Sequence, residues 1–317
     1  MNDQARTTTN LEHRIHDAER ELFHAVGVDV GESFLDLAGT GVRVRVLAHG
    51  HGPAVVLLHG VSESAAVWAP LFTELRGFRL LAVDLPGHGL SDPMDFRRGQ
   101  VREQAHRLLD DIFDALGFGQ VPVIGHSLGA MFALWHVAAG SGRISEVVAI
   151  GEPAVAFPGV RVRMPLSLLT VRGLGVAVLR SPSTLQVYRH LLAQGLGSAD
   201  AAAMPESLIE ALRWSARRPP NARTVASVMH AVDRFRRPRP ESVLTSAELA
   251  AITTPTTFIL GSDDPYLSVE GARPSIDQIP GATLHEVPGG HAPWLVDPRR
   301  AANLITTGLT AKIARPS

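Results

Sequence analysis

The residue types that could do chemistry gather in a short segment near the middle of the chain. Residues 121–130 read VPVIGHSLGA, an apolar run followed by a glycine, Ser127 and a second glycine. An apolar, alanine-rich run follows at residues 131–139. The pattern predicts a strand, a sharp turn and a helix, because the glycines leave room for the strained backbone of such a turn. This turn would place the Ser127 hydroxyl at the top of a sheet, beside the positive N-terminal end of a helix.

A serine hydroxyl is a weak nucleophile at neutral pH. It needs a base within hydrogen-bond reach, and that base needs an orienting acid. Asp264 and His291 both follow Ser127 in the chain, in turn-rich loops that come directly after β-rich runs. His291 would accept the serine proton and later give it to the leaving group, while Asp264 would hold the histidine in one tautomer. The three residues together would form a catalytic triad.

The elements that must position these residues alternate along the chain. The spacing of apolar residues predicts strands at 33–37, 42–48, 54–58, 79–83, 121–124, 144–150, 256–260 and 282–287. It predicts helices at 10–26, 64–76 and 101–116, after Ser127 to about 139, and from 298 onward. Thr9 and Glu12 resemble a capping box at the start of the first helix. Alternating strands and helices indicate an α/β fold with a mostly parallel sheet covered on both faces, and active sites lie at the carboxyl ends of such strands.

Two further regions flank or interrupt this alternation. Strand signals fade between about 154 and 251, where Leu-, Ala- and Arg-rich helical patches alternate with Pro and Gly. We predict a helical cap or lid at 154–251, a core at 32–153 and 252–317, and a helical extension at 1–31. The extension helix is expected to pack on its own domain; a homodimer contact and a flap over the site are the alternatives.

Composition excludes several classes of function. The 317 residues are 45% hydrophobic, carry a net charge of −1 and include no cysteine. Near-neutral charge gives no electrostatic case for nucleic acid or anionic membrane as a partner. No run of about 18 apolar residues is present, so no membrane span is expected, and the polar N-terminus predicts no secretory signal. We expect a cytoplasmic protein without disulfides, metal or cofactor, acting on a small molecule.

Five motifs carry a resemblance to a known family. They are LLHG at 57–60, DLPGHGLSD at 84–92, GHSLG at 125–129, GSDDP at 261–265 and GGHAPW at 289–294. In this order the chain resembles an α/β-hydrolase-fold protein with a helical cap, from about residue 32 onward except in the cap. The chain order Ser127, Asp264, His291 is also the order of that fold.

The resemblance implies roles for further residues. In such proteins the backbone N–H groups of the residue after the nucleophile, here Leu128, and of the residue after the His-Gly pair, here Val61, form an oxyanion hole. It also implies substrate-binding positions at His59, Gly60, His126 and Trp294.

The acid has competing candidates. The family places it third after the glycine of the GSDDP motif, which selects Asp264 and leaves Asp263 as a solvated carboxylate. Glu152 is an alternative, because some relatives place their acid at that position. Otherwise Glu152 would be a carboxylate near the pocket.

The resemblance also narrows the reaction. Epoxide hydrolases and haloalkane dehalogenases of this fold use an aspartate where Ser127 stands. A serine implies an esterase-like enzyme that cleaves a carboxylic ester, lactone or thioester of a small-to-medium apolar substrate through an acyl-enzyme. C–C bond hydrolases tend to carry Asn and Met where this chain has His126 and Leu128. They remain an alternative, as do a perhydrolase, a biosynthetic lyase or cyclase, and a non-catalytic ligand-binding member of the fold.

Overall fold

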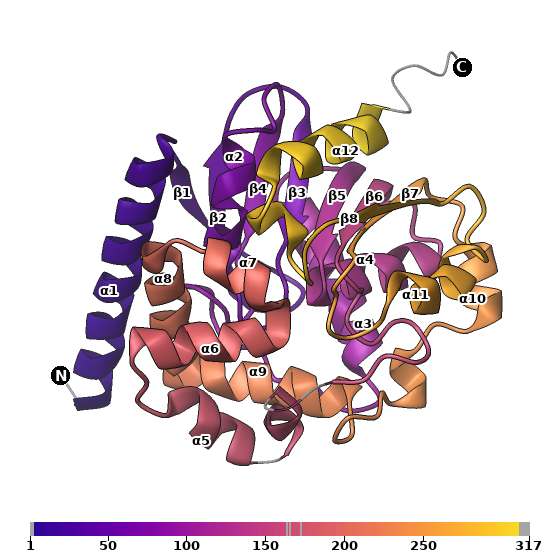
Figure 1. Ribbon diagram of the computed structural model, residues 1–317. Helices are drawn as coiled ribbons and strands as arrows, with labels where there is room; N and C mark the ends of the chain where they lie inside the picture. Colours follow the sequence, from indigo (N-terminus) through magenta and orange to yellow (C-terminus); the bar gives the residue numbers. More distant parts are fainter. Residues whose placement is uncertain (1–2, 163, 165, 172, 311–317) are drawn as a thin grey trace.

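The computed structural model describes residues 3–162, 164, 166–171 and 173–310. Over these residues, eight strands form one sheet in the order β1-β2-β4-β3-β5-β6-β7-β8 (Figure 1). The strands are β1 (Gly31–Asp36), β2 (Arg43–His49), β3 (Ala54–Leu58), β4 (Arg79–Val83), β5 (Val121–His126), β6 (Ile144–Ile150), β7 (Thr256–Gly261) and β8 (Thr283–Val287). β1, β2 and β4 pair antiparallel, and every other neighbouring pair is parallel. The predicted α/β class with a mostly parallel sheet is confirmed.

Helices cover both faces of the sheet. One apolar core lies between the sheet and α3 (Val101–Ala115), α4 (Leu128–Ala138), α10 (Ser246–Ala251) and α11 (Val269–Ile276). The other lies beneath η1 (Ala65–Trp68), α2 (Ala69–Phe72) and α12 (Pro298–Thr310), with η4 (Pro293–Leu295) beside them. The central strands are buried on both sides, which is why β3, β5, β6 and β7 read as continuous apolar runs in the sequence.

The described part of the segment between β6 and β7 forms helices that gather at one end of the sheet (Figure 1). They are η2 (Leu166–Thr170), α5 (Leu174–Arg180), α6 (Leu185–Leu196), α7 (Ser198–Ala203), α8 (Glu206–Arg217), α9 (Pro219–Val232) and η3 (Pro240–Ser242), followed by α10. We call η2 and α5–α9 the cap. Residues of the cap and of the loops that follow β3, β5 and β6 line one common cavity, so the cap covers the carboxyl ends of these strands.

Two predicted helices differ in the structure. The first helix, α1 (Asp3–Val26), begins before Thr9, so the predicted capping box does not start it. The helix predicted at 64–76 is shorter, because a 3₁₀ turn precedes a single α-helical turn. Pro70 stands at the start of that short turn, where its missing N–H is tolerated.

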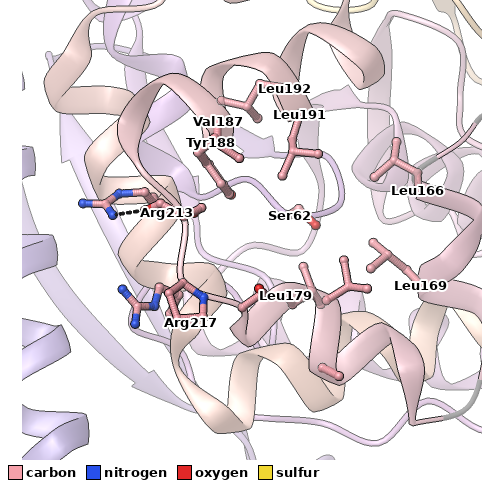
Figure 2. Close-up of a pocket in the computed structure, with 15 residues that line it drawn as sticks. Ser62, Leu166, Leu169, Leu179, Val187, Tyr188, Leu191, Leu192, Arg213 and Arg217 are labelled. Atoms are coloured by element: carbon pink, nitrogen blue, oxygen red, sulfur yellow. Dashed lines mark hydrogen bonds between the residues drawn. The ribbon is translucent and has the colours of Figure 1, made fainter.

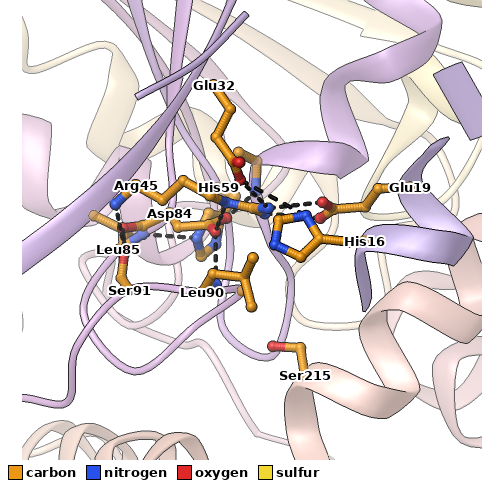
Figure 3. Close-up of polar contacts among 12 residues, drawn as sticks. His16, Glu19, Glu32, Arg45, His59, Asp84, Leu85, Leu90, Ser91 and Ser215 are labelled. Carbon is orange, nitrogen blue, oxygen red and sulfur yellow. Dashed lines mark hydrogen bonds and ion pairs between the residues drawn. The ribbon is translucent and has the colours of Figure 1, made fainter. Parts of the chain in front are cut away.

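A buried ion-pair network attaches α1 to the sheet (Figure 3). The Arg45 side chain of β2 is 0% exposed and donates to both carboxylate oxygens of Glu19 on α1, each at 2.7 Å. Its Nε donates to Asp84 at the end of β4, also at 2.7 Å. Asp84 additionally accepts the N–H groups of Ala65 and Leu90. Asp84 therefore organises the loops around it, although it lies at a strand end as a functional residue would.

Over the described residues, no helix is both long and apolar enough to cross a bilayer.

Candidate active site

Ser127 lies in the turn between β5 and α4, with φ 47° and ψ −106°. A non-glycine residue in such a conformation costs about 1–3 kcal/mol and persists only where its surroundings enforce it. A Cβ at Gly125 would come within 2.6 Å of the Ala130 backbone, and one at Gly129 within 2.2 Å of the Leu58 carbonyl oxygen. Strand and helix therefore approach too closely for any side chain but hydrogen, and the predicted tight turn is present.

Asp264 and His291 follow β7 and β8 and lie against each other. His291 Nδ1 is 2.7 Å from Asp264 Oδ2, and the two side chains are 3% and 1% exposed. The same Asp264 oxygen accepts the N–H of Glu152 at 3.0 Å, and the other accepts the N–H of Tyr266 at 3.0 Å. The carboxylate is fixed by three contacts, which leaves Nε2 as the ring nitrogen of His291 for proton transfer.

The local charges favour a basic imidazole. Burial lowers the pKa of His291, but the carboxylates of Asp264, Glu63 and Asp200 more than offset this and raise the pKa above its ordinary value. Burial raises the pKa of Asp264, and the neighbouring His291 and the two N–H donors more than reverse this, so that pKa is lowered. The pair therefore holds an ionised acid beside a strengthened base.

Ser127, Val61 and Leu128 line one small cavity of about 40 Å³. Its other lining residues are apolar apart from one tyrosine hydroxyl: Ala154, Val155, Val160, Val162, Leu166, Met229, Val232 and Tyr266. Within the described part of the chain, the N–H groups of Val61 and Leu128 meet no hydrogen-bond acceptor. Two backbone donors and the serine thus occur on the wall of one cavity, the combination that stabilises a developing oxyanion.

Glu63 supports the loop that carries Val61. Its buried carboxylate accepts the N–H of Gly60 at 2.7 Å and lies 2.8 Å from His126 Nδ1. His126 Nε2 in turn lies 3.1 Å from the carbonyl oxygen of His291. Buried polar contacts therefore join the loop after β3 to the loop that carries His291. Sequence analysis missed Glu63, since its partner His126 lies 63 positions away and no local pattern marks the pair.

A second cavity of about 460 Å³ lies under the cap, within the usual size range of ligand pockets. Figure 2 shows leucines, Tyr188 and the Ser62 hydroxyl around it. Arg213 and Arg217 line it with their stems while their guanidinium groups point away from the leucines (Figure 2). The Arg213 guanidinium donates to Glu210 and to a backbone carbonyl, and both arginines lie over the Trp214 ring. Apolar side chains therefore make up most, but not all, of the wall of this cavity.

The two cavities adjoin. Leu166 lines both, and the successive residues Val61 and Ser62 line one each. The two cavities therefore share part of their wall.

None of the four residues assigned to substrate binding lines either cavity: His59, Gly60, His126 and Trp294. His59 is 0% exposed, accepts the N–H of Leu85 and lies 2.7 Å from the carbonyl oxygen of Gly60. Trp294 is also 0% exposed and stacks on Trp68 at 4.8 Å. Their loops turn these side chains into the core beside the cavities, and their predicted contact with substrate stays a prediction.

Glu152, the alternative acid, is 0% exposed. Neither of its carboxylate oxygens has a hydrogen-bond partner in the described part of the chain. Burial, and then the charge of Asp264, raise the pKa of Glu152 well above its ordinary value. Asp264, and not Glu152, is the carboxylate within hydrogen-bond distance of His291. Asp263 is exposed, as expected for a solvated carboxylate.

Over the described residues, no group of three His, Cys, Asp or Glu side chains could hold a metal ion.

Comparison with known proteins shows which family this chain belongs to and which proteins it is similar to. The profile of a family described as the alpha/beta hydrolase fold matches residues 53–298. A haloalkane dehalogenase of Agrobacterium fabrum is 34% identical over 145 residues, which are 45% of this chain and 46% of that enzyme. A 2-hydroxy-6-oxononadienedioate/2-hydroxy-6-oxononatrienedioate hydrolase of Cupriavidus pinatubonensis is 28% identical over 73% of this chain and 77% of its own length.

Solved structures share the fold at lower sequence identity. The carboxylesterase CesB of Bacillus subtilis superimposes with a TM-score of 0.74 at 19% identity, over 95% of this chain and 98% of that one. A 2-hydroxy-6-oxo-6-phenylhexa-2,4-dienoate hydrolase of a Rhodococcus strain gives 0.73 at 21% identity, over 90% and 100%. By their names, these proteins act on different bonds.

Proposed function

Because this chain belongs to the alpha/beta hydrolase fold family and is similar to several hydrolases, we propose that it is a serine esterase. Its proposed substrates are apolar carboxylic esters, lactones or thioesters. The observation that carries this proposal is the shared cavity wall of Ser127, Val61 and Leu128 beside the Asp264–His291 pair. Tyr266 lines that cavity and packs against the His291 ring, with 4.5 Å between the ring centroids. The Asp264–His291 pair therefore lies next to the small cavity.

In the proposed reaction, Ser127 Oγ attacks the carbonyl carbon while its proton passes to Nε2 of His291. The N–H groups of Val61 and Leu128 stabilise the oxyanion, each worth about 3 kcal/mol in such sites. His291 then gives the proton to the leaving alcohol or thiol as the acyl-enzyme forms. A water molecule attacks the acyl-enzyme in the same way, releasing the acid and restoring Ser127.

The cavities support an uncharged, apolar substrate with one compact and one bulky group. The room near Ser127 is about 40 Å³, against about 460 Å³ under the cap. A carboxylate on the substrate would be poorly matched, because the guanidinium groups of Arg213 and Arg217 point away from the leucines that line the cap cavity (Figure 2). We further propose a cytoplasmic location, since a chain without cysteine suits a reducing compartment.

C–C bond hydrolysis is the second candidate, favoured by the similarity to the Cupriavidus enzyme over 73% of this chain. The name of that enzyme describes a dioate, a substrate with two carboxylates, which the apolar cavities here do not match. Dehalogenation is not proposed, since family members of that type use an aspartate where Ser127 stands. A panel of p-nitrophenyl esters assayed beside a vinylogous diketone separates the two candidates.

A fluorophosphonate probe tests the proposal without knowledge of the substrate. We expect covalent labelling of the wild-type protein at Ser127, located by peptide mass spectrometry, and no labelling of Ser127→Ala. Ser141→Ala is the matched control, since Ser141 bonds His136 away from both cavities and its loss should leave labelling unchanged. Folded wild-type protein that resists the probe would favour a non-catalytic binding protein instead.

A further inference from the structure

The cap holds the loop that carries His291. Three successive N–H groups of that loop donate to two cap residues. Gly290 donates to Asp200 Oδ1 at 2.9 Å, His291 to the Leu196 carbonyl oxygen at 2.7 Å, and Ala292 to Asp200 Oδ2 at 2.7 Å. Leu196 ends α6 and Asp200 lies in α7, so this short segment of the cap receives every N–H around the proposed base.

The contact is too close for other residues at its centre. A Cβ on Gly290 would lie 2.1 Å from the Leu196 carbonyl oxygen and 2.9 Å from Asp200 Oδ2. Gly197, between α6 and α7, has φ 108° and lies against Gly290 from the other side. Glycines therefore occur on both sides of the junction where backbone meets backbone.

Burying the Asp200 carboxylate between α7 and the His291 loop is energetically unfavourable unless its oxygens accept hydrogen bonds. Asp200 is 0% exposed and forms no ion pair within the described residues, so the two N–H groups are its hydrogen-bond donors. Burial raises its pKa, and these N–H groups and the nearby His291 act against that rise. Because a buried carboxylate with unmade hydrogen bonds is strongly unfavourable, Asp200 holds the loop in one conformation.

The core holds the rest of His291. Its ring meets Asp264, and its carbonyl oxygen lies 3.1 Å from His126 Nε2. The base is thus held by the core at its ring and carbonyl oxygen, and by the cap at its N–H.

We propose that Asp200 is a positioning residue for the proposed hydrolase, which keeps the His291 loop in the conformation that places the imidazole against Asp264. This inference rests on the proposed function. Asp200 does not line either cavity, so its effect passes through the loop and not through the substrate.

The experiment measures the rate of fluorophosphonate labelling at Ser127 as a function of pH, in wild type, Asp200→Asn and Asp200→Ala. An asparagine keeps one acceptor oxygen and can serve one of the two N–H groups, while alanine serves neither. A displacement of about 1 Å in a catalytic group costs about 100-fold, so we expect a loss of 10- to 100-fold, larger for alanine than for asparagine.

The pH profile separates positioning from general destabilisation. Titratable groups that face His291 are Asp264 and Tyr266 from the loop after β7, Glu63 from the loop after β3, His126 at the end of β5 and Asp200 from the cap. Removing the Asp200 charge removes one contribution that favours the imidazolium, so the acid limb should move to lower pH. Asp233→Asn is the matched control: Asp233, directly after α9, is a buried carboxylate that accepts the Arg236 N–H, and neither rate nor profile should change.

The outcomes are distinct. An unlabelled wild type refutes the proposed function itself. A labelled wild type with an Asp200→Asn variant of unchanged maximal rate refutes only the positioning role, whether or not its pH profile moves. Should the variants not fold, hydrogen exchange on the wild-type protein decides. The amides of residues 290–292 should then open in the same denaturant-dependent step as α6 and α7. Opening together with β8, while α6 and α7 exchange earlier, would overturn the inference.

Discussion

Adjacent carboxylates after β7 differ in their surroundings and hence in what they can do. Asp264 has a side chain that is 1% exposed, receives two backbone N–H groups and pairs with His291, whereas Asp263 is exposed to solvent. Charge in a buried, hydrogen-bonded position acts on its neighbour far more strongly than charge in water. At the scale of single residues, environment selects the acid.

The pH dependence of the proposed reaction follows from this pair. A general base must be neutral, and the pKa of His291 is raised, so activity should rise with pH through a midpoint above the ordinary value for histidine and be lost below it. Labelling or ester hydrolysis measured between pH 5 and 9 checks this. A midpoint below the ordinary value would contradict the assignment of His291.

Replacing Asp264 tests the same pair. In Asp264→Asn the main contribution that raises the pKa of His291 is lost, so the acid limb should move to lower pH while the rate falls about 10³- to 10⁴-fold. The neighbouring change Asp263→Asn should leave the acid limb in place and alter the rate by no more than about twofold, because solvent screens this surface charge. Equal effects of the two changes would refute the choice between them.

Which residues could be predicted depends on how local their signal is. The turn at Ser127 requires glycines two positions before and after it, and that pattern is visible in five consecutive letters. Glu63 and Asp200 were missed because their partners are 63 and 90 or more positions away and carry no motif. The motif around Trp294 gives its proximity to His291 but not the direction of its side chain, which is buried against Trp68.

Among the elements, α1 joins parts of the molecule that are distant in sequence. It packs along α8 of the cap, where Glu12 accepts from Arg218 at 2.7 Å and Arg14 lies over the Trp214 ring. Towards its other end, Glu19 pairs with Arg45 of the sheet. The helix predicted at 10–26 is present within α1, and its residues Ile15 and Leu22 are buried. Its start could not be predicted, because Glu12 is used in a long-range ion pair and not in a capping box.

Breaking the Glu19–Arg45 contact should be costly. Glu19→Ala leaves the Arg45 guanidinium buried with Asp84 and the half-exposed Glu32, and we expect a loss of about 3 kcal/mol in the free energy of unfolding. Urea unfolding followed by circular dichroism measures it. Glu21→Ala, an exposed position on the same helix, should change stability by less than about 0.5 kcal/mol. A Glu19→Ala variant as stable as wild type would show that the network has no net effect.

Across the whole molecule, the cap contributes to the walls of both cavities. Helices α5, α6 and α8 supply most of the wall of the large cavity. Their bounds could not be predicted from periodicity, because proline and glycine divide the cap into short helices whose apolar residues face two directions, the cavity and the core.

Filling the large cavity should select against bulky substrates. We expect Leu192→Trp to reduce kcat/KM about tenfold for octanoyl esters, or for acetates of large alcohols, since misfit in an apolar pocket costs about 1–3 kcal/mol. The p-nitrophenyl acetate rate and fluorophosphonate labelling should stay near wild type. Leu185→Trp, on the same helix but outside the cavity, serves as the control. Unchanged rates for both bulky series would place the substrate elsewhere.

The attachment of the cap has a consequence for how a substrate arrives. Because α8 is fastened to α1, and the α6–α7 junction to the His291 loop, a swing of the entire cap would break both connections. The surface beside α5 and the start of α6 is different: Leu174, Val187 and Leu191 are 42%, 52% and 36% exposed, and Val187 and Leu191 also line the large cavity. We expect this exposed apolar surface to be the entrance of the large cavity, where an apolar substrate is desolvated before it contacts Ser127.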